Sequence, residues 1–142
     1  MISNNNIIKV LDLLCDPKAC YVLDRIYEAH DNGAEGYVIA NQANLSPARF
    51  YRLMSSLREQ SLIEKRKQRY FITLFGSTVY SAKRIVQKAL DNYYRLKVID
   101  SLKEQREISV TELNELIGIF IEDYQLKDIL IKHRAQNQES SQ

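Results

Sequence analysis

The residues with the clearest chemistry are cations gathered in the middle of the chain. Four of them lie within five residues: Lys65, Arg66, Lys67 and Arg69. Ammonium and guanidinium groups donate charge-assisted hydrogen bonds, and phosphate oxygens are strong acceptors for them. The chemistry that this run offers is therefore phosphate binding.

The charge of the whole chain is distributed unevenly around this run. The formal net charge is only +2, yet residues 46–106 carry 14 basic and 5 acidic side chains. Residues 1–45 carry 3 basic and 6 acidic side chains, and residues 107–142 carry 3 and 7. A basic segment between two acidic ones is typical of a phosphate-binding surface, although charge alone also fits a solvated helix face.

A helix over residues 46–60 is expected just before the cationic run. Ser46 is a good N-cap residue, and Pro47 is tolerated in the first helical turn. Four apolar side chains share one face of this helix at a spacing of three and four residues: Phe50, Leu53, Met54 and Leu57. The opposite face has no acid before Glu59, and its residues are Ala48, Arg49, Tyr51, Arg52, Ser55 and Ser56. Such a face suits the major groove of DNA.

A β-hairpin is predicted around the four cations. Leu62 and Ile63 precede them, and an apolar, β-favouring run from Tyr70 to Ile72 follows. The tip lacks the Asn-Gly or Asp-Gly pair of the favoured tight turns, so this prediction rests on the pattern alone. A short helix is expected over residues 38–44, with Asn44 making the turn into the next helix because it tolerates left-handed backbone.

The segments VIANQANLSP at 38–47, LIEKR at 62–66 and YFITLFG at 70–76 together resemble a winged helix-turn-helix of the MarR/ArsR-like prokaryotic regulators. The segment LCDPKACYVL at 14–23 is similar to the opening helix of the ArsR type. The resemblance covers about residues 8–80. It implies a mainly α fold with a small β-hairpin wing. Two departures are Asn44, where many relatives have glycine, and the absence of the thiol-rich metal motif.

Two helices are expected before the helix-turn-helix, and a long one after it. The first covers residues 7–14, and Asp16 and Pro17 begin the second. A single helix is predicted from Thr73 to about Glu104, roughly 45 Å at ~1.5 Å per residue. Its apolar residues repeat with alternating spacings of four and three, the seam pattern of a coiled coil. The dimer interface that we expect from this seam contains Val79, Val86, Ala89, Tyr93 and Leu96. The alternative is that helices later in the same chain cover it, and both arrangements can coexist.

The C-terminal part is expected to form two further helices. Ser109 and Glu112 have the spacing of a capping box, and a last helix is predicted over residues 122–134. The excess of acids there would repel phosphate, so we interpret this part as a dimerisation or docking element. The predicted organisation is a DNA-binding domain at 1–76, a helical dimerisation region at 77–134 and a disordered tail at 135–142.

No catalytic, metal or cofactor site is predicted. The chain contains no Gly-rich phosphate loop and no Ser/His/Asp arrangement, and its two histidines complete no four-ligand zinc set. Cys15 and Cys20 are expected to be small buried residues, with a redox switch as the alternative. No apolar run is long enough to span a bilayer and no signal peptide is recognised, so we expect a cytoplasmic protein.

The function that these observations favour is a homodimeric transcriptional regulator that binds double-stranded DNA. Residues 46–60 would enter the major groove, and the basic wing would contact the flanking backbone or the minor groove. The alternative is a winged-helix module that binds another protein and no DNA. An enzyme is the least favoured class. The operator and any small-molecule effector are not specified by the sequence.

Overall fold

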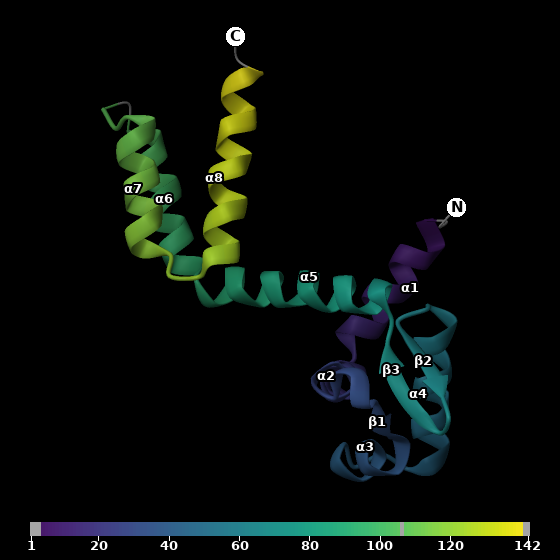
Figure 1. The fold of residues 1–142 in the computed structure, drawn as a ribbon. Coiled ribbons are helices and arrows are strands. Elements are labelled where there is room, and N and C mark those ends of the chain that lie inside the picture. The colour runs from purple at the N-terminus through teal and green to yellow at the C-terminus, as the bar shows by residue number, and fades with distance from the viewer. Residues whose placement is uncertain (1–3, 106, 141–142) are drawn as a thin grey trace. The chain divides into compact units, whose positions relative to one another are not determined.

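The computed structural model describes residues 4–105 and 107–140. Over these residues the chain forms eight α-helices, a 3-10 turn and one small antiparallel sheet (Figure 1). It divides into two compact units, Met1–Lys83 and Arg84–Gln142, and the division falls within helix α5 (Leu74–Asp91). The protein is therefore mainly α, as expected, but each unit has a core of its own.

The N-terminal unit contains four complete helices, which are α1 (Asn4–Cys15), α2 (Pro17–Glu28), α3 (Gly36–Gln42) and α4 (Pro47–Glu59). The predicted caps are present. The side chain of Asp16 accepts a hydrogen bond from the Lys18 amide at 2.9 Å, and that of Ser46 accepts one from the Arg49 amide at 3.4 Å. Each cap is followed by proline at the first helical position, where the missing N–H is not needed.

The sheet has three strands in the order β1-β3-β2. The predicted hairpin consists of β2 (Ile63–Arg66) and β3 (Arg69–Ile72), and its register pairs Ile63 with Ile72 and Arg66 with Arg69. Strand β1 (Ala34–Glu35) was not predicted. It has only two residues, follows the 3-10 turn η1 (His30–Asn32), and is a strand only because it pairs with β3. Because its partner strand lies more than 30 residues later, the residues around β1 contain no local sequence pattern that indicates a strand.

The hairpin turn consists of two residues, Lys67 and Gln68, with φ values of +47° and +67°. Positive φ at both central positions is what a type I′ turn requires, and this turn matches the twist of the flanking strands. Asn44 also has positive φ, at +53°, and makes the predicted turn between α3 and α4. The backbone geometry expected of Asn-Gly is thus adopted here by two residues with side chains.

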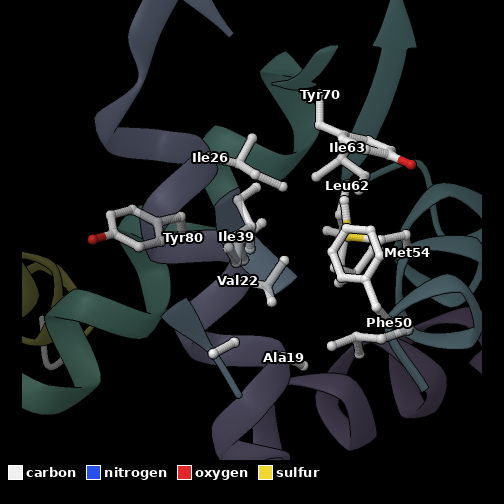
Figure 2. Packing of buried hydrophobic residues seen from close by; sticks show 14 of the residues in the cluster. Ala19, Val22, Ile26, Ile39, Phe50, Met54, Leu62, Ile63, Tyr70 and Tyr80 are labelled. Carbon is white, nitrogen blue, oxygen red and sulfur yellow. The ribbon is translucent and has the colours of Figure 1, made fainter. Parts of the chain in front are cut away.

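The core of the N-terminal unit is formed by one face of each helix and the inner face of the sheet. Figure 2 shows side chains of α2, α3, α4 and the hairpin converging. The labelled core residues are Ala19, Val22, Ile26, Ile39, Phe50, Met54, Leu62, Ile63, Tyr70 and Tyr80. Burial of such side chains is worth about 1.5–3 kcal/mol each and is the main stabilising contribution to the unit.

The first half of α5 belongs to this core. Tyr80 is only 7% exposed and stacks on Tyr27 of α2, with the ring centroids 4.1 Å apart. Lys83 forms an ion pair with Asp24 at 3.0 Å. Helix α5 therefore continues to contact α2 for two turns beyond residue 76, where the sequence placed the end of the DNA-binding domain.

The start of α5 is fixed to the end of the hairpin. The hydroxyl of Thr73 accepts a hydrogen bond from the Gly76 amide at 2.8 Å, as expected of a cap. A Cβ atom at Gly76 would lie 1.9 Å from the carbonyl oxygen of Leu62. Only glycine therefore allows this close approach.

The C-terminal unit consists of the end of α5 together with α6 (Tyr93–Glu104), α7 (Val110–Phe120) and α8 (Tyr124–Glu139). The single helix predicted from Thr73 to Glu104 is wrong, because Asn92 interrupts it with φ −103° and ψ 14°. The amide side chain of Asn92 donates to the Lys88 carbonyl at 2.9 Å, and the same carbonyl accepts the Asn92 backbone amide at 3.1 Å. Helix α8 continues to Glu139, so residues 135–139 are helical and not disordered as expected. Residues 141–142 lie outside the described part.

The second core is small and apolar. Its buried residues are Ile99, Leu113, Ile117, Ile121 and Leu126. Helices α6 and α7 lie side by side (Figure 1), and the predicted capping box of Ser109 and Glu112 begins α7. An ion pair of 2.7 Å between Lys88 and Asp123 joins α5 to the start of α8. Among the described residues, no helix has the length and hydrophobicity needed to cross a membrane.

Candidate nucleic-acid interface

Helix α4 is amphipathic, as its sequence predicted. The four apolar residues of its inner stripe are buried, at 9% exposure or less. On the opposite face the predicted residues are exposed, with Ser56 half-buried: Ser46, Ala48, Arg49, Tyr51, Arg52, Ser55 and Ser56. The hydroxyl of Ser56 donates to the Arg52 carbonyl at 3.0 Å, so it is partly engaged within the helix.

The N-terminus of α4 is held in place from α2. The ammonium group of Lys18 donates to the Ala43 carbonyl at 2.5 Å, at the C-cap of α3. The left-handed turn at Asn44 follows directly, and α4 begins three residues later. Lys18 therefore fixes the turn between α3 and α4 from the core side.

The pleat of the hairpin divides its cations between two faces of the sheet. Side chains that pair directly across two strands lie on the same face, and alternate residues lie on opposite faces. Lys65 pairs with buried Tyr70 and thus lies on the face turned toward α4. Arg66 and Arg69 pair with each other and lie on the outer face, while Lys67 is at the tip.

The two arginines of the outer face are engaged inside the protein. Arg66 forms an ion pair with Glu64 at 3.0 Å, and its guanidinium lies 4.1 Å from the centre of the Phe71 ring. Arg69 forms an ion pair with Glu35 at 2.6 Å and also donates to the carbonyls of Asn32 and Gly33. We predicted that all four hairpin cations contact DNA, and the structure gives these two arginines internal partners.

A groove of about 580 Å³ lies between α3, the start of α4 and the hairpin. Lys65 and Lys67 line it from the hairpin, and Tyr51 lines it from α4. Tyr37 and Asn41 of α3 also line it, and neither was among the predicted site residues. Tyr37 is 69% exposed and Tyr51 64% exposed, so two phenol groups border a groove that contains lysines. In the sequence, Tyr37 is marked only by its position directly after Gly36, and its exposure could not be read there.

Tyr37 interacts with the ion pair of Glu35 and Arg69. A hydrogen bond to the carboxylate of Glu35, and the negative charge of that group, raise the pKa of Tyr37 above its usual value. Glu35 thus interacts with both Tyr37 and Arg69, and the hydroxyl of Tyr37 stays protonated near neutral pH.

The residues predicted for the dimer interface are divided between the two units. Val79 packs against the core of the N-terminal unit, and Ala89 and Leu96 pack against that of the C-terminal unit. Val86 and Tyr93 are exposed, at 61% and 50%. Helices of the same chain therefore cover part of the seam, which was the alternative stated for it.

The cysteines do not form a paired site. The thiol of Cys20 donates to the Leu14 carbonyl at 3.0 Å, and burial raises the pKa of Cys20. Cys15 is exposed, contrary to the expectation that it is buried. No group of three or more metal-ligating side chains occurs within residues 4–105 and 107–140.

No protein-family model matches the chain, and no curated protein or solved structure is similar to it at a significant level. The geometry of the exposed face of α4 and of the neighbouring groove is therefore the basis for the functional argument.

Proposed function

We propose that the protein is a transcriptional regulator that binds double-stranded DNA sequence-specifically as a homodimer. In this proposal the N-terminal unit is a MarR/ArsR-like winged helix-turn-helix, with α3 and α4 as the two helices and the β2–β3 hairpin as the wing. The observation that carries the proposal is the exposed face of α4, which has two arginines and no acid from Ala48 to Ser56.

The chemistry of this face matches what the major groove presents. Arginine binds the O6 and N7 atoms of guanine with two parallel hydrogen bonds, so Arg49 and Arg52 are the candidates for base reading. Tyr51 and Ser55 offer hydroxyl groups to bases or phosphates. The buried stripe of α4 keeps the helix fixed on its core, so that the exposed face is presented rigidly.

The proposed homodimer rests on apolar side chains exposed in the C-terminal unit. Val86 and Leu90 lie one turn apart at the end of α5, and Tyr93 and Tyr94 begin α6. Their exposure ranges from 50% to 80%, and large apolar patches commonly mark protein–protein interfaces. A twofold dimer would place two α4 helices on successive half-sites of a palindromic operator.

A module that binds only another protein is the second candidate. The observation that favours it is Leu74, which is 90% exposed beside the 40% exposed Phe75 at the start of α5. The two functions differ in their response to salt. DNA binding through several phosphates weakens steeply as salt rises, whereas a protein interface of mixed polarity does not.

Selection of bound fragments from a pool of random duplexes, using the purified full-length protein, tests the proposal. The selected duplex then allows a matched comparison of Arg52→Ala with Arg58→Ala, since Arg58 is exposed in the last turn of the same helix. Arg52→Ala should cost about 1–3 kcal/mol and relax the preference at one base position. Failure to enrich any sequence, or equal small effects of both substitutions, would contradict the assignment of α4 as the reading helix.

A further inference from the structure

The groove and the outer face of the hairpin differ in charge. Lys65, Lys67 and Arg69 line the groove, so the long side chain of Arg69 reaches it although strand pairing places this residue on the outer face. The one acid among the described lining residues, Glu35, is paired with Arg69. The hollow on the other side of the hairpin, of about 860 Å³, is lined by Arg66, His30 and two acids, Asp31 and Glu64, of which Glu64 is paired with Arg66. A phosphate chain is therefore attracted more strongly to the groove than to the outer hollow.

The cations of the two faces also differ in availability. Lys65 and Lys67 are exposed, and the ammonium group of Lys65 lies 5.5 Å from the centre of the Tyr70 ring. Arg66 would have to leave both Glu64 and the Phe71 ring to bind a phosphate. Arg69 would have to leave an ion pair and two backbone carbonyls.

We propose that one sugar–phosphate strand of a DNA duplex lies in the groove between α3 and the hairpin, and that Tyr37 is a phosphate-binding residue there. Lys65 and Lys67 bind phosphates from the hairpin wall, and Tyr37 donates its hydroxyl from the α3 wall. This inference rests on the proposed function. It extends the interface to α3 and removes Arg66 from it.

The position of Tyr37 supports this role. Its side chain is 69% exposed at the first turn of α3, and the groove that it lines contains both lysines. Its hydroxyl is a hydrogen-bond donor, and its interaction with the Glu35 carboxylate raises the pKa of Tyr37. On binding, the hydroxyl exchanges this carboxylate for a phosphate oxygen, and Glu35 retains Arg69 as its partner.

The first test compares the salt dependence of duplex binding for single substitutions in the full-length protein. Lys67→Gln should reduce the slope of log K against log salt by about 0.9, the value for one phosphate contact in B-DNA. Arg66→Gln is the matched control on the same hairpin and should leave the slope unchanged. An equal reduction for both substitutions would overturn the proposal, because the outer face would then contact the backbone too.

The second test uses Tyr37→Phe, which removes only the hydroxyl. Duplex affinity should fall roughly threefold to tenfold, the range for one hydrogen bond. Tyr124→Phe is the matched control, since Tyr124 is 80% exposed at the start of α8 and belongs to neither proposed interface. The thermal midpoint should not change for either variant. Unchanged affinity for Tyr37→Phe would overturn the assignment of Tyr37.

A scan of single methylphosphonates locates the strand. The effect of Lys67→Gln should disappear when the phosphate that it contacts is replaced by the uncharged group, and the effect of Tyr37→Phe should disappear at the same or a neighbouring phosphate. The two positions must lie on one strand, because both side chains line one groove. Positions on opposite strands would overturn the proposal, as would equal affinity for single-stranded DNA.

The same titrations distinguish this inference from the proposed function. A wild-type protein that binds no duplex overturns both. If the wild-type protein binds duplexes, and the Tyr37 and Lys67 variants have normal affinities and salt slopes, only the proposal that a DNA strand lies in the groove is overturned.

Discussion

Tyr80→Ala should destabilise the N-terminal unit while leaving the C-terminal unit unchanged. Tyr80 belongs to α5, which contributes to both units, but its ring is 7% exposed and stacks on Tyr27 of α2. A buried aromatic side chain covers about 150–250 Å², which corresponds to roughly 4–6 kcal/mol at about 25 cal/mol per Å². Because alanine keeps part of the buried area and the surrounding side chains partly fill the cavity, we expect the free energy of unfolding to fall by about 3–5 kcal/mol.

Hydrogen exchange measured by mass spectrometry on the full-length protein resolves this loss by region. Amide protons of α2 near Val22 and Ile26 should exchange roughly 100-fold to 3,000-fold faster, since 1.4 kcal/mol corresponds to a factor of ten. Amide protons of α7 near Leu113 and Ile117 should keep their protection, because those residues lie in the other core.

Tyr124→Ala is the control for this experiment. Tyr124 is 80% exposed, and removal of an exposed side chain changes stability by no more than about 0.5 kcal/mol. Equal loss of protection in α2 and α7 after Tyr80→Ala would show that the two cores unfold together. No loss in α2 would show that the first half of α5 does not support the N-terminal core, and either result would refute the division at Lys83.

Two further predictions concern the C-terminal unit. Val86→Asp combined with Tyr93→Asp should convert the proposed dimer into a folded monomer in sedimentation equilibrium, because the new charges would have to be desolvated at the contact. A wild-type protein that is already monomeric at tens of micromolar would contradict the dimer. The hydrogen bond from Lys88, and then that from the Leu126 amide, lower the pKa of Asp123. Its stabilising effect is therefore present above the ordinary carboxyl pKa of about 3.9 and is lost as the pH falls further. Asp123→Asn should flatten the acid side of the stability profile of this unit, and an unchanged profile would contradict this role.

Local chemistry was predictable where it is encoded within a few residues. Asp16 with Pro17, Ser46 with Pro47, and Ser109 with Glu112 begin helices as their spacing indicates. Asn44 adopts the left-handed conformation that its position predicted. The apolar residues on either side of the cations also predicted the hairpin, even though neither turn residue is glycine or asparagine.

Features that depend on distant residues were not predictable in the same way. The interruption at Asn92 has no glycine or proline to mark it, and α5 keeps the backbone bond from the Asn92 amide to the Lys88 carbonyl at 3.1 Å. Strand β1 depends on pairing with residues 34 and 36 positions later. The same long-range pairing brings Glu35 to Arg69, so the sequence could not show that this arginine has an internal partner.

The two-residue turn at Lys67 and Gln68 has a consequence for how the charge of this surface can change. It fixes the register of β2 against β3, and a shift of one residue would exchange the two faces of the strand. Glu64 and Arg66 would then face α4, and Lys65 would face outward. An insertion or deletion of one residue in β2 would therefore exchange the Lys65 ammonium group for the neutralised ion pair of Glu64 and Arg66 at the groove, with no change in the number of charged residues on the hairpin.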